Sequence, residues 1–179
     1  MKTVVVYESM YGNSHRVADC IGTALAEVGS AIVVPVAAAT SDLIAGADLV
    51  IVGGPTHVHS MSTSRTRASA PEEARKSAAK HGTAVLDLDP NWRGPGVRDW
   101  LRALPGSQGK CAAAFDTRLT GRALLTGRAS RAIARGLERH GFQLIAEPES
   151  FLVDSDTRLL DSEAERAGHW ARGLAASMR

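Results

Sequence analysis

The start of the chain constrains its fold more than any other segment. The β-branched run from Val4 to Val6 predicts a buried parallel strand, which breaks at a polar loop that extends to Ser14. After the loop, Val17, Ile21 and Leu25 recur at helical spacing. A strand, a tight polar loop and a helix start in this order can bind phosphate. The reason is that free N–H groups of the first helical turn and the helix macrodipole attract an anion.

The composition of this loop indicates which kind of phosphate it would hold. It lacks the Lys of a nucleotide-triphosphatase loop and the three glycines of a dinucleotide fingerprint. A single phosphate monoester held by neutral donors is therefore expected, and the glycine lets the backbone approach it closely. The alternative is an ordinary helix N-cap at Asn13 or Ser14. The candidate binding residues are Ser9, Met10, Tyr11, Gly12, Asn13 and Ser14.

These residues resemble the phosphate loop of the flavodoxin family. That loop has hydroxyl residues at its first, third and sixth positions and glycine at its fourth. Ser9, Gly12 and Ser14 match the pattern, and Tyr11 departs from it. The run from Ser9 to Gly12 is similar to flavodoxin-like quinone reductases of the tryptophan-repressor-binding-protein type. The resemblance implies that FMN is the cofactor and that its phosphate lies at this loop.

Strand patterns alternate with helical patterns along the rest of the chain. This alternation predicts a doubly wound, five-stranded parallel α/β sheet with helices on both faces, as a single domain over 1–179. The resemblance implies that its strands have the flavodoxin-like order 2-1-3-4-5. Pro71 is expected in the first turn of a helix that Gly82 ends. The later strands are expected at 31–36, 49–52, 110–115 and 142–145, the last one extending through 151–153. Helices are expected at 40–47, 63–80, 96–104, 127–140 and 162–178.

The third strand pattern ends at Gly53, and a polar segment follows it to Met61. In the predicted order the carboxyl ends of the first, third and fourth strands meet in one crevice. The segment resembles the second flavin loop of the same family, which packs beside the isoalloxazine ring. The alternative is that Gly-Gly-Pro merely turns the chain. The resemblance assigns Pro55, Thr56, His57, Val58 and His59 to the cofactor site.

A third segment, expected as a loop over 116–126, occupies the position of the family's other ring-binding loop. Position rather than motif assigns Asp116, Thr117 and Arg118 to the cofactor site. Arg118, Arg122 and the two histidines of the second loop outnumber Asp116, so a positive surrounding of the ring is expected. Members of the family often stack aromatic rings on the flavin, but none occurs between Thr117 and Gly141.

Composition excludes several classes of protein. The chain has 179 residues, a net charge of +2 and no run of like charge that would suggest nucleic acid. No apolar run approaches the length of a membrane span, and the N-terminus does not read as a signal peptide. Cys20 and Cys111 lie far apart and are expected to be buried, reduced thiols of a cytoplasmic protein.

Other chemistries of this fold lack their key residues. The pair His57 and His59 has no third ligand at recognisable spacing, so no metal site is predicted. A receiver domain would need an acceptor Asp where Gly53 stands. A low-molecular-weight phosphatase would need a Cys in the first loop, and Cys20 lies more than a turn into the helix. No residue is assigned a catalytic role.

The resemblance therefore implies an FMN-binding, flavodoxin-like redox protein that acts in electron transfer. Its partner would be a redox protein or a small quinone-like or NAD(P)H substrate. Two alternatives remain open at this point. One is an NAD(P)H:quinone-type oxidoreductase, and the other is a flavodoxin-fold binding module without flavin.

Overall fold

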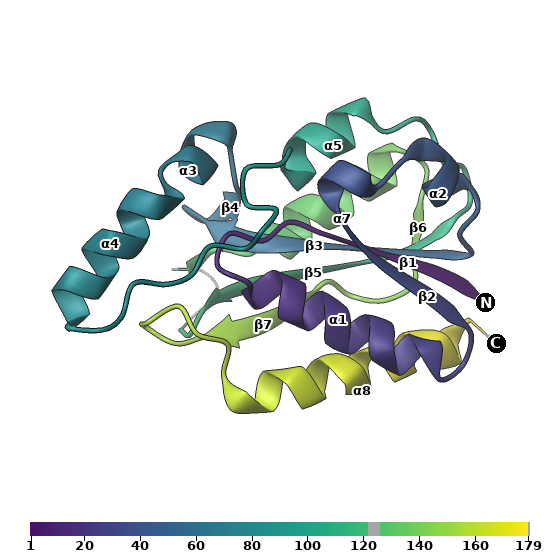
Figure 1. Ribbon diagram of the computed structural model, residues 1–179. Helices are drawn as coiled ribbons and strands as arrows, with labels where there is room; N and C mark the ends of the chain where they lie inside the picture. The colour runs from purple at the N-terminus through teal and green to yellow at the C-terminus, as the bar shows by residue number, and fades with distance from the viewer. Residues whose placement is uncertain (122–125, 179) are drawn as a thin grey trace.

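A parallel sheet with the strand order β2-β1-β3-β5-β6 runs through the centre of the molecule (Figure 1). The computed structural model describes residues 1–121 and 126–178. The strands are β1 (Lys2–Tyr7), β2 (Ser30–Pro35), β3 (Leu49–His57), β4 (Ser60–Met61), β5 (Cys111–Leu119), β6 (Gln143–Leu144) and β7 (Glu149–Val153). The helices are α1 (Asn13–Ala26), the short 3-10 helix η1 (Val36–Ala38), α2 (Ser41–Ala45), α3 (Ser64–Ala68), α4 (Ala70–His81), α5 (Val97–Ala103), α7 (Ala129–Arg139) and α8 (Asp161–Ser177).

Helices cover both faces of the sheet, as the sequence predicted. Helices α1 and α8 pack on one face, and α2, α5 and α7 pack on the other (Figure 1). Strand β1 shows why its sequence is continuously apolar. Val4 and Val6 belong to the core beneath α5 and α7, whereas Val5 and Tyr7 belong to the core beneath α1 and α8.

The third strand does not end at Gly53, as expected, but continues to His57. Gly54 and Pro55 extend the parallel ladder and pair with residues of β5. Gly53 is needed here for close packing, because a Cβ on it would lie 2.1 Å from the Cζ atom of the Phe115 ring. The glycines therefore do not turn the chain. The turn lies at Val58 and His59, between β3 and β4.

The edge of the sheet beyond β3 also differs from the expectation. Strand β5 extends to Leu119, so the predicted loop over 116–126 begins as a strand. The fifth strand pattern is divided into β6 and β7, which both pair in parallel with β5. Pro148 lies between them and has no N–H group to donate to a ladder.

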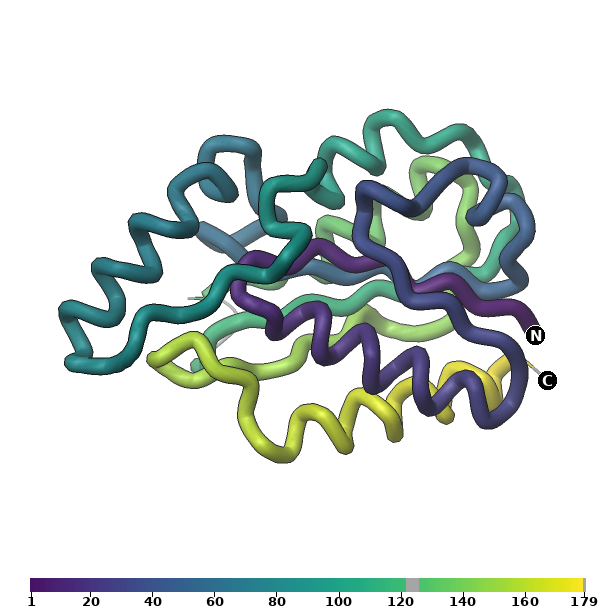
Figure 2. The backbone as a smooth tube through the Cα atoms, in the orientation of Figure 1, coloured from purple at the N-terminus to yellow at the C-terminus, as the bar shows by residue number. Residues whose placement is uncertain are grey.

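The predicted helix over 63–80 is two helices, α3 and α4, which meet at Ser69. Pro71 lies in the first turn of α4, and Gly82 ends it with a left-handed φ of 66°. Both helices lie beyond the carboxyl edge of the sheet, apart from the two helical layers (Figure 2).

Neither cysteine is fully buried, although both pack against the core beneath α1 and α8. Burial raises the pKa of the Cys20 thiol. None of the helices in the described part of the chain combines the length and the hydropathy that a membrane span needs.

Candidate functional site

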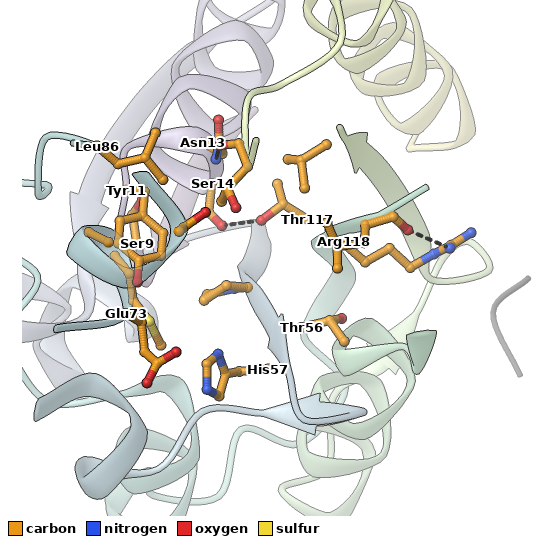
Figure 3. A pocket seen from close by; sticks show the side chains of 17 residues that line it. Ser9, Tyr11, Asn13, Ser14, Thr56, His57, Glu73, Leu86, Thr117 and Arg118 are labelled. Carbon is orange, nitrogen blue, oxygen red and sulfur yellow. Dashed lines mark hydrogen bonds between the residues drawn. The ribbon is translucent and has the colours of Figure 1, made fainter. Parts of the chain in front are cut away.

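A cavity of about 250 Å³ lies at the carboxyl edge of the sheet (Figure 3). The loop after β1 and the ends of β3 and β5 form its floor and walls, which is the convergence that the strand order predicted. Helix α4 and the turn after β7 complete it. The predicted site residues that line the cavity are Ser9, Met10, Tyr11, Asn13, Ser14, Pro55, Thr56, His57, Thr117 and Arg118.

Gly12 shapes the loop after β1. It is the N-cap of α1 and has a left-handed φ of 83°, a conformation that glycine adopts without strain. Neither Asn13 nor Ser14 is the N-cap, and Gly12 at that position has no side chain that could cap the helix. The first N–H groups of α1 have no intrahelical acceptor and remain for another partner. This end of α1 has the backbone donors and the dipole direction that an anion requires.

Ser9 carries the clearest sign of a missing partner. Its side chain is buried, with 4% exposure, and its Oγ atom has no hydrogen-bond partner among the described residues. A buried hydroxyl without a partner is costly and uncommon in proteins. Because Ser9 also lines the cavity (Figure 3), a ligand there can supply the missing hydrogen bond.

The other three polar side chains of the loop are already engaged. The hydroxyls of Ser14 and Thr117 are hydrogen-bonded at 2.8 Å. Tyr11 donates to the carbonyl of Ala70, and burial raises its pKa. The amide of Asn13 holds the turn after β7 by donating to the carbonyl of Thr157. Tyr11 and Asn13 therefore shape the loop, and Ser9 is the side-chain donor that it leaves free.

The second loop folds into the β3–β4 hairpin, and some of the residues expected from it line the cavity while others do not. Pro55, Thr56 and His57 line the cavity, but Val58 and His59 do not. Those two residues form the tight turn with φ values of 46° and 69°, and Val58 is 75% exposed. No group of three or more potential metal ligands is found within residues 1–121 and 126–178.

The carboxylate of Asp116 lies in the protein interior and accepts hydrogen bonds from its neighbours. It is completely buried beneath the cavity and does not line it. Its Oδ2 atom accepts hydrogen bonds from the hydroxyl of Thr56 at 3.0 Å and from the N–H of Ser130 at 2.8 Å. The Thr56 hydroxyl in turn accepts from the N–H of Ala129. Asp116 and Thr56 thus satisfy the free N–H groups at the start of α7.

The guanidinium of Arg118 points away from the cavity (Figure 3). Its Nη1 atom donates to the carbonyls of Leu119 and Gly121 and to the hydroxyl of Thr126. Arg118 therefore holds the chain after β5 and lines the cavity with the rest of its side chain. Arg122 lies outside the described residues. Among the described residues, His57 lines the cavity, the Arg118 guanidinium points away from it (Figure 3), and His59 does not line it.

Seven further residues line the cavity, and the sequence did not predict them as part of the site. Glu73, Ala74 and Ser77 come from α4, and their segment carries no motif of the flavodoxin family. The sequence signal for them is modest, namely alanines at positions 70, 74 and 78 on one helical face. The others are Leu86, Leu119, Val153 and Thr157. The aromatic rings that line the described cavity are those of Tyr11 and His57.

Comparison with models of protein families found no match, and comparison with curated proteins found none either. Solved structures do match over nearly the whole chain. An archaeal flavodoxin is 19% identical with a TM-score of 0.65, and the match covers 99% of both chains. Flavodoxin 2 from Bacillus cereus is 17% identical with a TM-score of 0.67, and the match covers 98% of this chain and 99% of the other.

A WrbA-like flavodoxin from Agrobacterium tumefaciens is also similar, at 18% identity and a TM-score of 0.60. The match covers 99% of this chain and 97% of the other. Identities this low establish architecture rather than activity. The sheet order, the helices on both faces and these full-length matches show that the chain has the flavodoxin-like fold.

Proposed function

We propose that this protein binds FMN and acts as a flavodoxin-like redox protein in electron transfer. The observation that carries the proposal is the buried, unpartnered hydroxyl of Ser9 at the cavity beside the uncapped start of α1. Backbone N–H groups and a neutral hydroxyl suit a phosphate monoester. The fold that the chain shares with flavodoxins supports the same ligand.

The proposed arrangement divides the cofactor between the three segments of the cavity. Ser9, Ser14 and the first N–H groups of α1 would hold the phosphate. The ends of β3 and β5, with Pro55, His57 and Thr117, would border the ring. FMN supplies the redox chemistry when it is bound, and the protein contributes binding, orientation and control of solvent access. Met10, Tyr11, Gly12 and Asn13 would shape the loop around the phosphate.

A spectrum and a titration test this proposal. Protein purified without added flavin should show the visible absorption of a flavoprotein, or the flavin-free form should quench added FMN with a stoichiometry of one. Riboflavin, which lacks the phosphate, should bind more weakly than FMN. A colourless protein that binds neither compound would reject the proposal and would favour a flavodoxin-fold binding module without flavin.

The second candidate is an NAD(P)H:quinone-type oxidoreductase. The observation that favours it is the run from Ser9 to Gly12 together with the segment from Gly53 to Met61, which resembles such reductases. The similar WrbA-like structure supports it as well. Steady oxidation of NAD(P)H on addition of a soluble quinone would favour the enzyme. Reduction by a redox protein without this turnover would favour the electron carrier.

A further inference from the structure

The chain between β4 and α5 makes a long excursion past the cavity, and buried polar contacts fix where it starts. The hydroxyl of Ser62 donates to the carboxylate of Glu8, which follows β1. Arg67, whose side chain is only 8% exposed, donates to Ser62 at 2.9 Å and pairs with Asp99 at 2.8 Å. A buried, hydrogen-bonded charge such as that of Arg67 is costly to leave without its partners. The first end of the excursion is therefore firmly held.

The second end is held equally well. The side chain of Asp89 is 1% exposed and lies 2.9 Å from Nδ1 of His15 in the first turn of α1. The N–H of Asp89 also donates to the carbonyl of Met10. Asn91 donates to the hydroxyl of Tyr7, and burial raises the pKa of this tyrosine to about 12. Residues 69–88 thus lie between two fixed ends.

The middle of the excursion is held much more weakly. The buried residues of α4 are Ala70, Ala74 and Ala78, each of which buries a single methyl group as its side chain. Helix α1, by contrast, buries large side chains such as Ile21 and Leu25. The free energy of burial rises with apolar area, so α4 gains little from its packing. Figures 1 and 2 show α4 extending beyond the edge of the sheet.

Two side-chain contacts tether α4 over the cavity. The hydroxyl of Tyr11 donates to the carbonyl of Ala70 at 3.0 Å. At the other end of α4, Nδ1 of His81 lies 3.0 Å from Oδ1 of Asp156, in the turn after β7. That turn is itself held by Asn13. Both tethers therefore lead to the loop after β1, where we place the phosphate.

The cavity is small, and α4 with the segment after it forms one of its sides. At about 250 Å³ the cavity is smaller than the roughly 300–1,000 Å³ of typical small-molecule sites. Glu73, Ala74 and Ser77 of α4 take up one side of it, with Leu86 from the segment that follows. Movement of this side would enlarge the cavity for a ligand of ordinary size.

We propose that residues 69–88 form a hinged cover that opens to admit the ligand and closes over it, with the pair of His81 and Asp156 as its latch. The inference rests on the proposed FMN site, since FMN is the ligand that the cover would retain. The fixed ends at residues 62–67 and 89–91 confine the movement to the segment between them.

Hydrogen–deuterium exchange on the full chain without ligand tests the cover directly. Amides of residues 70–88 should exchange at least tenfold faster than those in the middle of α1, because segments with few buried contacts open locally. Added FMN should slow exchange in 70–88 far more than in α5. Protection of 70–88 equal to that of α1 in the ligand-free protein would overturn the proposal.

Release of FMN, followed by the fluorescence of the free flavin, tests the latch. His81→Ala and Asp156→Asn should each release FMN roughly threefold to tenfold faster, and the double variant should be no faster than either single variant. Arg172→Ala is the matched control, because it breaks another exposed ion pair, with Glu27 at 2.9 Å, away from the cover. Wild-type release rates in both latch variants would reject the latch.

The two experiments separate this inference from the proposed function. If the protein binds no FMN, the proposed function fails. Exchange in the ligand-free chain still decides whether residues 69–88 open. If FMN binds and 70–88 exchanges as slowly as α1, the function stands and the cover is rejected.

Discussion

Ser14 and Thr117 meet at the wall of the cavity with their hydroxyl oxygens 2.8 Å apart. They lie 103 residues apart in the chain, one in the first turn of α1 and the other near the end of β5. Both side chains are buried. This hydrogen bond links the proposed phosphate loop to the proposed ring-binding strand. A phosphate at the loop would compete with Thr117 for the Ser14 hydroxyl.

Replacement of Ser14 by Ala should weaken FMN binding about tenfold or more, because a hydrogen bond to a charged phosphate contributes roughly 1.5–3 kcal/mol. Riboflavin should lose much less affinity. Fluorescence titrations of both ligands measure the difference. Thr117→Val is the control, because it removes the partner and leaves the Ser14 hydroxyl free for the phosphate. Equal losses for FMN and riboflavin would mean that Ser14 is structural.

Ser9→Ala should change stability and binding in opposite directions. The variant removes a buried hydroxyl that has no partner among the described residues, so the ligand-free protein should be as stable as the parent or up to about 1 kcal/mol more stable. FMN should nevertheless bind roughly tenfold more weakly, since its phosphate loses a donor. Urea unfolding and FMN titration of the same preparation give both values. A large loss of stability would show that Ser9 has a structural role.

Gly12 should be replaceable for folding but not for binding. A Cβ at this position would meet no protein atom within 4 Å, yet its φ of 83° strains most side chains. Gly12→Asn should be close to the parent in stability, because Asn tolerates this conformation, whereas Gly12→Val should lose roughly 1–3 kcal/mol. Both variants should lose FMN, since a side chain would obstruct the approach of the phosphate. Parental FMN affinity in Gly12→Asn would reject the placement of the phosphate.

Asp116 should matter for stability rather than for the ligand. Asp116→Asn weakens the charge-assisted hydrogen bonds from the Thr56 hydroxyl and from the N–H of Ser130 at the start of α7, at a cost of roughly 1.5–3 kcal/mol. Thermal unfolding of the ligand-free protein measures this loss. Thr56→Val removes the linked hydroxyl and should destabilise the same helix end. If the melting temperature is unchanged and FMN binds more weakly, Asp116 belongs to the cofactor site instead.

The sequence was informative where local and tertiary requirements coincide. The run from Val4 to Val6 is apolar throughout because the sheet is covered on both faces, and Gly12 stands where a left-handed residue begins α1. The alternation of elements predicted the doubly wound sheet, and the flavodoxin-like strand order placed the three loops together. Ten of the candidate residues, from Ser9 to Arg118, line one cavity for this reason.

The sequence was misleading where a distant residue decides the local conformation. Gly53 was expected at the end of the strand, where the chain turns. It lies within the strand instead, and a glycine is needed there because the Phe115 ring of the neighbouring strand packs against it. Arg118 lines the cavity, as its position predicted, but nearby carbonyls hold its guanidinium, which the sequence did not indicate. The alanine face of α4 predicts a helix without showing where it packs. The contribution of Glu73 to the cavity was therefore not predictable.

Glu73 places a negative charge at a cavity that we propose for an anion. It lines the same cavity as Ser9, and its carboxylate adds to the raised pKa of the Tyr11 hydroxyl in the loop after β1. Lys76 lies 3.7 Å from Glu73 but is closer to Glu72, at 2.8 Å. The charge of Glu73 is thus only partly offset. Across a cavity of this size the repulsion amounts to roughly 0.5–1 kcal/mol.

Glu73→Gln should therefore bind FMN about twofold to fivefold more tightly and leave riboflavin affinity unchanged, since roughly 1.4 kcal/mol corresponds to tenfold. The gain should shrink as salt rises, because mobile ions screen the two charges. Glu72→Gln is the matched control. It removes the same charge from the same helix at a residue that does not line the cavity. FMN titrations of both variants at low and high salt measure these differences in affinity. If both variants change FMN affinity equally, Glu73 does not face the bound phosphate, and α4 lies farther from the ligand than the closed cavity implies.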